Sequence, residues 1–336
     1  MKLRLEPSDE FMHPGPEPTF NESMYFNFCA DEGVSGFVRI GNRPNERYAE
    51  TTVCLYLPDG RVAFMFRRPE IEGNERFDAG GTRFEVLDPF ERLTVRYDGT
   101  VILLEDPLAM ADPRVAFTEN PAVPASVDLV YTGASTPFGG EPEVSHERPG
   151  EEFARGHYEQ LVRATGTVRV GDEEWTVDAR GLRDHSWGPR TWQAPWYYRW
   201  LTVNLDDGTG MMLNRIARQD GDGTRGGFVW DGERLRTVRH VDVRTGWTDG
   251  TPYHRSVEAT FTLDDDPAAP PRVLTGEVRN LIPLRNRRDG RVTRISEGLT
   301  RWRVDRPLRD GGATTGHGLS EYLDQLVEGV PVGLDE

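Results

Sequence analysis

Residues 166–190 read GTVRVGDEEWTVDARGLRDHSWGPR, and the first part of this stretch decides the fold. Gly166–Val170 and Trp175–Arg183 alternate apolar and polar residues, which is the period of a half-buried β-strand. Gly171-Asp172 lies between them and is typical of a tight turn. We therefore predict that this stretch forms an antiparallel hairpin.

The same pattern of strand, turn and strand recurs along most of the chain. Further hairpins are predicted for 48–57 with 61–68, 91–97 with 100–105 across Asp98-Gly99, 199–205 with 211–218, and 227–230 with 235–247. Single strands are predicted at 257–263, 272–281 and 291–303. Helical signals are few: a turn or two at 106–111 and a short C-terminal helix over Leu319–Val327. The sequence thus predicts an all-β protein built from antiparallel barrels or sandwiches.

The length and one change in composition predict two domains. The chain has 336 residues, and a domain usually takes roughly 100–200. Residues 132–152 are rich in Gly, Pro, Ser and Glu, which favours a connection between domains. With a boundary near Gly150, we expect an N-terminal β-domain at 1–150 and a C-terminal β-domain at 151–336 that ends in the short helix.

Charge and composition exclude several classes of partner and cofactor. The net charge of −16 would repel nucleic-acid phosphates and anionic membranes. No apolar run reaches the ~18 residues of a membrane span, so no membrane insertion is expected. Two cysteines, Cys29 and Cys54, make no disulfide framework and fit a cytoplasmic location. Lys2 is the only lysine, which excludes Schiff-base chemistry and a phosphate-binding loop. We expect no organic cofactor, and the oligomeric state stays open.

Residues 184–200 form the chemically most distinctive segment. Four of the eight tryptophans lie between 187 and 200, with two tyrosines among them. On a strand, Asp184 and His185 would point to opposite faces unless a bulge intervenes. Consecutive Asp, His and Ser residues therefore cannot form a nucleophilic triad. The histidines show no pair at zinc-ligand spacing, so no metal is expected, although a site assembled from distant residues stays open.

Two interpretations of this segment remain. In the structural one, Arg183, Asp184 and Arg190 form a buried network that locks two barrels together, and the tryptophans fill barrel ends. In the functional one, the segment lines a deep aromatic pocket with one titratable group in its wall. A histidine, or a carboxylic acid kept protonated by burial, could donate a proton there. The tryptophan and tyrosine faces would stabilise a nearby cation.

The run GLRDHSWGPRTW (181–192) resembles the signature of the carotenoid hydratase (hydroxyneurosporene synthase)-like superfamily. HYEQ (157–160), GLSEY (318–322), NESMYF (21–26) and GNRPNE (41–46) fit its uncharacterised bacterial branch. The resemblance covers most of the chain and implies two consecutive lipocalin-like β-barrels or half-barrels that present an apolar cavity. Relatives include alkene hydratases, fungal pericyclases of the Diels–Alder type and stress proteins without known catalysis. The resemblance therefore implies a choice among activities.

Several residues outside the signature are further candidates. A predicted strand carries Asn21, Ser23, Tyr25 and Asn27 on one face, which either lines a barrel lumen or faces solvent. A loop with Arg43, Asn45, Glu46 and Arg47 is either a binding loop at a barrel mouth or a surface ion cluster. Glu159 and Gln160 could reach a pocket near His185. Glu297 interrupts a strand-like segment and is either a buried acid or an exposed carboxylate.

These observations predict a cofactor-independent enzyme that acts on a hydrophobic, isoprenoid- or polyketide-like small molecule. The reaction would be an acid-assisted hydration, dehydration, isomerisation or cyclisation at a C=C bond. His185 or Asp184 would handle the proton. Substrate-binding residues would be Trp187, Arg190, Trp192, Trp196, Tyr198, Trp200, Glu159, Tyr25 and Asn45. The alternatives are a lipocalin-like carrier without turnover, and a structural partner in a biosynthetic complex with an exposed apolar patch.

Overall fold

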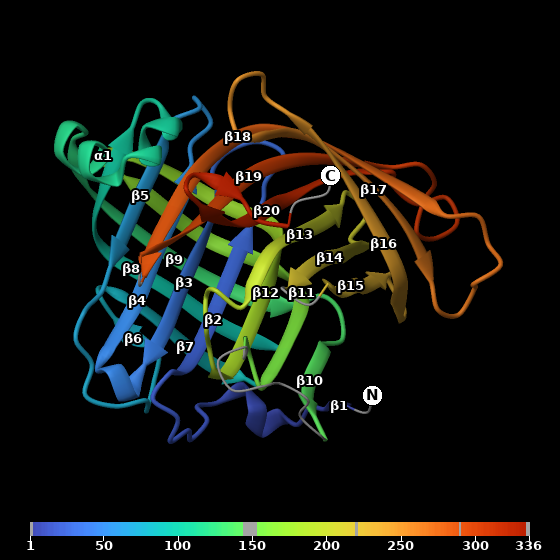
Figure 1. The fold of residues 1–336 in the computed structure, drawn as a ribbon, viewed down its shortest axis with the longest axis horizontal. Coiled ribbons are helices and arrows are strands. Elements are labelled where there is room, and N and C mark those ends of the chain that lie inside the picture. The colour runs from blue at the N-terminus through green and yellow to red at the C-terminus, as the bar shows by residue number, and fades with distance from the viewer. Residues whose placement is uncertain (1–2, 144–152, 219–220, 289, 334–336) are drawn as a thin grey trace. The chain divides into compact units, whose positions relative to one another are not determined.

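The computed structural model describes residues 3–143, 153–218, 221–288 and 290–333. Most of the described residues are in antiparallel strands, as predicted (Figure 1). The strands form two sheets, and the chain divides into two compact units. The first unit consists of Met1–Glu105 with Glu119–Thr191, and the second of Asp106–Thr118 with Trp192–Glu336.

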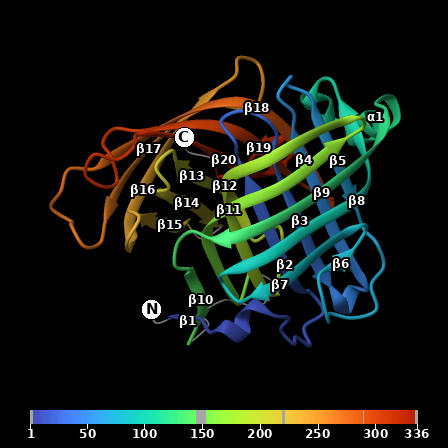
Figure 2. The same cartoon turned by 180° about the vertical axis from the view of Figure 1, so that it is seen from behind.

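The first unit is a ring of strands. In ring order these are β11 (Gly156–Val170), β12 (Glu173–Pro189), β2 (Phe20–Phe28), β3 (Ser35–Arg43), β4 (Tyr48–Tyr56), β5 (Val62–Arg67), β8 (Arg92–Leu104) and β9 (Ala122–Gly133), which pairs back with β11. Figure 2 shows β9 lying between β8 and β11. Shorter strands extend the sheet: β1 (Leu3–Arg4), β6 (Asp78–Ala79), β7 (Thr82–Asp88) and β10 (Phe138–Pro142).

The second unit repeats this plan. Its ring runs through β13 (Pro195–Leu205), β14 (Gly210–Arg218), β15 (Gly221–Trp230), β16 (Leu235–Trp247), β17 (His254–Leu263), β18 (Arg272–Arg288), β19 (Arg291–Val304) and β20 (Thr315–Val327), which pairs with β13; β21 (Val330–Pro331) adds to the edge. The helices of the described chain are η1 (Pro7–Glu10), η2 (Pro44–Glu46), η3 (Pro107–Ala111), which packs on β18, and α1 (Pro113–Glu119).

Each ring encloses its own hydrophobic core. Inward-facing residues such as Met24, Phe26 and Val38 form the first core, and Leu201, Val203 and Trp302 belong to the second. Because side chains alternate along a strand, the neighbours of these residues point outward. Two side chains from one strand can therefore sit in different environments although they are adjacent in sequence.

The units differ from the predicted domains 1–150 and 151–336. The division falls after Thr191, because β11 and β12 pair with β9 and β2 and complete the first ring. The segment Asp106–Thr118 belongs to the second unit. The predicted connection at 132–152 includes the end of β9 and all of β10, and residues 144–152 lie outside the described part of the chain.

Two local predictions were wrong. Leu319–Val327 is not a helix but part of β20, which is buried on both faces and so lost the alternation that marks a strand. Asp98-Gly99 is not a turn, because both residues lie within the single strand β8, which pairs with β9 along most of its length on one edge. On its other edge, β8 pairs first with β7 and then with β5. In both places, pairing with distant strands overrides the local preference. The other predicted hairpins are confirmed.

Candidate functional site

Strand β12 carries polar groups on both of its faces. Its pairing with β11 and β2 shows no register shift between Arg183 and Trp187. Arg183 and His185 therefore share the inward face with their partners Phe26 and Met24, whereas Asp184 points outward. As the residue spacing predicted, Asp184 and His185 lie on opposite faces and do not act at one site.

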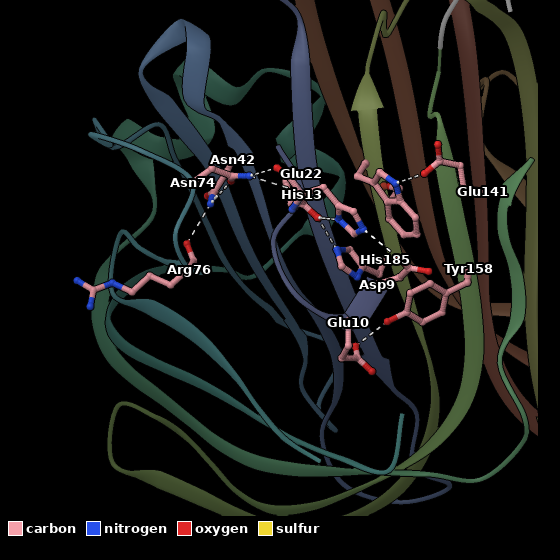
Figure 3. A network of polar contacts seen from close by, with 12 residues as sticks. Asp9, Glu10, His13, Glu22, Asn42, Asn74, Arg76, Glu141, Tyr158 and His185 are labelled. Atoms are coloured by element: carbon pink, nitrogen blue, oxygen red, sulfur yellow. Dashed lines mark hydrogen bonds and ion pairs between the residues drawn. The ribbon is translucent and has the colours of Figure 1, made fainter. Parts of the chain in front are cut away.

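The inward face places His185 in a buried polar cluster (Figure 3). Oε1 of Glu22 lies 2.8 Å from His185 Nε2 and 2.9 Å from His13 Nδ1. Oε2 of Glu22 accepts from the backbone N–H of His13 at 2.8 Å and from Asn74 Nδ2 at 3.3 Å. Although burial acts to raise it, the pKa of Glu22 lies below its usual value because the two imidazoles bond to the carboxylate. Glu22 is therefore ionised.

Aromatic rings surround this cluster. The His13 ring stacks on Trp187 at 4.0 Å with 5° between the planes. Rings of Tyr158, Phe77 and Trp187 stand edge-on to His185 at 5.5, 5.9 and 5.3 Å. Trp187, predicted to bind substrate, is itself buried, and its Nε1 donates to Glu141 at 3.2 Å.

The N-terminal segment closes onto the same face of β12. Arg183 donates to both carboxylate oxygens of Glu10, at 2.5 and 2.8 Å, and Tyr158 donates to Glu10 at 2.6 Å. Burial acts to raise the pKa of Glu10, but Arg183 holds it below the usual value. Asn45, predicted to bind substrate, instead donates to the carbonyls of Gly15 and Glu17 and fastens this segment.

The outward face of β12 carries a separate ion pair. Asp184 contacts His157 Nε2, and Glu159 lies 3.8 Å from the same nitrogen. Burial acts against the charge on His157, but Asp184 raises the pKa of His157 to about 9. The pKa of Asp184 is lowered despite burial, chiefly by His157. Asp184 is thus a carboxylate at neutral pH and is a poor proton donor.

Three other predicted residues lie on this outward face or beside it. Glu159 points away from His185, because its neighbour Tyr158 is the residue paired with His185. Tyr25 on β2 is the register partner of Asp184 and shares its outward face. Both faces of β2 are buried, so this face neither lines the barrel lumen nor faces solvent. Arg190 donates to Ser186 Oγ and to the carbonyl of Phe153, at 2.9 Å in each case.

In the second unit, two carboxyl groups face each other across neighbouring strands. Glu297 on β19 is the direct register partner of Glu321 on β20, and their side chains are hydrogen-bonded. Tyr198 Oη donates to Glu321 Oε1. The exposed fractions of Glu297 and Glu321 are only 4% and 8%. Burial, and then the charge of Glu321, raise the pKa of Glu297 well above its usual value. This shift favours the protonated form of Glu297, as expected for two buried carboxyl groups that share a site.

The carboxyl pair lies on the outward face of its strands, opposite the core residues Leu201, Trp302 and Tyr322, and this face is mainly apolar and aromatic. Along one cross-strand row, Ile282 pairs with Glu297, and Trp200 pairs with Glu321. The alternation of the strands puts Leu284, Ile295, Leu299, Leu319, Leu323 and Tyr198 on the same face. Trp200, Ile295 and Leu299 are only partly buried. An acid group is thus set among side chains that suit an apolar ligand.

The aromatic run at 187–200 divides between the units. Trp187 belongs to the first unit, and the other members belong to the second. The carbonyl of Trp192 accepts from Gln325 at 2.7 Å. The Trp196 ring lies against Gly333, where a Cβ atom would come within 2.1 Å of it. Only Tyr198 and Trp200 of this run are placed at the carboxyl pair.

Comparison with known proteins gives a family. A domain family of unknown function (DUF7064) matches residues 6–326. The chain belongs to this family. A search among curated proteins returned no match. None of the helices in the described residues is long and apolar enough to cross a membrane.

Several solved structures are similar to the DUF7064 chain. A Nitrosomonas europaea protein provisionally assigned as an AttH has a TM-score of 0.65 at 15% identity and covers 96% of each chain. Kievitone hydratase from Nectria haematococca has a TM-score of 0.51 at 10% identity and covers 90% of this chain and 88% of its own. CghA has a TM-score of 0.50 at 12% identity, covering 95% and 90%. At the level of the fold, these structures confirm the resemblance to tandem lipocalin-like proteins.

Proposed function

We propose that this DUF7064 protein is an enzyme that protonates a C=C bond of an apolar small molecule, with Glu297 as the proton donor. The observation that carries the proposal is a pair of buried carboxyl groups on directly facing strand positions within an apolar sheet face, where the pKa of Glu297 is raised. Enzymes often obtain a general acid at neutral pH by burying one carboxyl near another. Glu297 takes the role that the sequence suggested for His185 or Asp184, because Asp184 is ionised and His185 is bonded to Glu22.

The proposed chemistry balances without a further reagent except water. Glu297 gives its proton to one alkene carbon, and a cation develops on the neighbouring carbon. The faces of Tyr198 and Trp200 would stabilise that charge. Water then adds and returns a proton to the carboxyl pair in a hydration. Loss of a different proton to the carboxyl pair gives an isomerisation. Attack by a second C=C bond forms a ring and a new cation, and loss of a proton from that cation to the carboxyl pair completes a cyclisation. One similar structure is named a hydratase, which makes hydration the first reaction to test.

The test begins with a ligand screen that follows tryptophan fluorescence on addition of terpenoid, polyene and steroid-like compounds. Each compound that binds is incubated in D₂O with wild type, Glu297→Gln, His185→Ala and the control Glu277→Gln, and analysed by mass spectrometry. Glu277 is exposed and pairs with Arg279, so its loss should not affect turnover. We expect wild type and Glu277→Gln to make a deuterated product, and Glu297→Gln to be about 10²–10⁴-fold slower.

Each other outcome has a clear meaning. Equal turnover by wild type and Glu297→Gln would show that Glu297 is not the acid. Loss of turnover in His185→Ala, with Glu297→Gln unaffected, would place proton donation in the first unit. Binding without conversion of any compound by wild type would favour the carrier function instead.

A further inference from the structure

We propose that His13, Glu22 and His185 bind a divalent transition-metal ion, with Zn²⁺ as the first candidate, inside the ring of the first unit. The three side chains come from the N-terminal segment, β2 and β12, and they point toward one another in Figure 3. Two imidazole nitrogens and one carboxylate oxygen lie within 4.8 Å of each other. Two histidines and one carboxylate form a common ligand set for zinc with a fourth position left to water.

The distances suit an ion after a small movement. Glu22 Oε1 lies 2.8 Å from His185 Nε2 and 2.9 Å from His13 Nδ1. A tetrahedral Zn²⁺ with bonds of about 2.0–2.1 Å would hold its ligand atoms about 3.3 Å apart. Each distance to Glu22 would therefore lengthen by about half an ångström, and the two imidazole nitrogens already lie within 4.8 Å of each other. His13 lies on a segment outside the strands of the ring, so it can make this adjustment.

The charge around the cluster favours a cation. Asp9, Glu10 and Glu22 are buried with exposed fractions of 4%, 1% and 0%, and Arg183 is the buried guanidinium that pairs with Glu10. Among the described residues, the donors to Glu22 are two imidazoles, Asn74 and a backbone N–H, none of which is an arginine or lysine. Counted without the two histidines, the three carboxylates and Arg183 carry a formal charge of −2, which a divalent ion would balance.

Neighbouring groups are arranged as they are around metal ligands. Glu22 uses Oε2 to accept two N–H groups, which leaves Oε1 to the two imidazoles. Ligating carboxylates usually have such outer partners, which fix their orientation and raise metal affinity. Nε2 of His13, the nitrogen that faces away from Glu22, lies 3.6 Å from Asp9 Oδ1, which is an ion-pair distance and not a hydrogen bond.

A second group on the outward face supplies a matched comparison. His157, Glu159 and Asp184 also bring three ligand atoms within 4.8 Å. The charge of Arg190 acts on both His157 and Asp184, and the His157 side chain is 43% exposed. The positive charge of a nearby guanidinium opposes the binding of a cation, and the solvent exposure of the His157 side chain weakens that binding. We therefore place the ion at the inward cluster, and His157 serves as the control.

The test uses untagged, full-length protein, stripped with a chelator and then titrated with Zn²⁺ or Co²⁺. Metal content is measured by mass spectrometry, and the visible spectrum of bound Co²⁺ reports the coordination. The variants are His13→Ala and Glu22→Gln, with His157→Ala as the control, and circular dichroism checks folding. We expect one tight ion per chain in wild type and His157→Ala, and about 100-fold weaker binding in His13→Ala and Glu22→Gln.

Should Glu22→Gln fail to fold, His13→Ala decides the question alone, because His13 lies outside the strands. Unchanged metal affinity in His13→Ala would overturn the proposal. Loss of the ion in His157→Ala, with His13→Ala normal, would move the site to the outward face and also overturn it. Absence of binding by wild type would overturn the proposal.

Discussion

Both units bury carboxyl groups, but the neighbours of these groups differ. In the first unit, Glu10 faces Arg183, and Asp184 faces His157, so each carboxyl meets a cation and stays ionised. In the second unit, Asp324 also meets cations, Arg199 and Arg294, but Glu297 faces another carboxyl, Glu321, and its pKa is raised well above the usual value by burial and by Glu321. The same functional group is thus a structural anion beside a cation and a candidate acid beside a second carboxyl.

This difference shows why residue type alone does not identify a catalytic group. Burial penalises the charged form of every carboxyl, and the partner decides whether the charge survives. A cation across the strand gives an ion pair that holds the fold together. A second carboxyl across the strand gives a site that keeps a proton, which is useful for chemistry.

The largest expected effect comes from removing the cation of a matched pair. Arg183→Met leaves Glu10 buried without its counter-ion, and we expect the free energy of unfolding to fall by about 3–5 kcal/mol. Urea denaturation at pH 7 measures this. The control Arg163→Met removes an exposed partner of Asp178 and should leave stability close to wild type. Equal effects of the two substitutions would contradict the idea that buried pairing holds the first ring.

A second prediction concerns the buried His254 in the second ring. His254 inside the second ring bonds to Ser320, and burial, with the charge of Arg199, lowers the pKa of His254 to about 3. The unfolded chain binds this proton more readily, so the stability is present above pH 6.5 and is lost as the pH falls toward 3.

We expect a loss on the order of 2–3 kcal/mol from this group between pH 7 and pH 4.5. The His254→Gln variant should lack this part of the pH dependence. The exposed His240→Gln is the control. If His254→Gln and wild type lose the same stability over this range, His254 does not stay neutral in the fold.

The smallest effect is expected at the outward ion pair. The pKa of His157 is raised to about 9, so its contribution is fully present below pH 6.5 and is lost as the pH rises through 9. Because its side chain is 43% exposed, the contribution should stay below about 1 kcal/mol. His157→Ala should therefore destabilise the protein slightly at pH 7 and less at pH 10, by denaturation at both values. A larger effect at pH 10 would mean that Asp184 does not hold His157 charged.

Local features of the fold could be predicted from the sequence. Hairpins such as 166–183 need only alternation and a turn, which lie within a few residues of each other. The domain boundary could not be predicted, because it depends on the pairing of β2 with β12. These two strands are far apart in the sequence, and no local signal indicates that they pair. The opposite orientation of Asp184 and His185 followed from strand periodicity alone.

The partners of the site residues were beyond the sequence. Glu22 lies 163 positions from His185, so only the closed ring reveals that they meet. In the sequence, Glu297 is recognisable as a carboxyl group within a predicted strand. Its partner Glu321 lies in a segment that the sequence predicts to be helical, and a helical residue cannot be a cross-strand neighbour. The cause was the double burial of β20, which hides the strand period.

The protonation of Glu297 is the central claim, and infrared difference spectroscopy measures it without a substrate. The spectrum of wild type minus Glu297→Gln at pH 7 should contain the carbonyl band of a protonated carboxyl group, shifted in D₂O. The corresponding Glu277→Gln spectrum should show carboxylate bands only. If wild type minus Glu297→Gln also shows carboxylate bands alone, Glu297 is ionised, and its assignment as the proton donor is wrong.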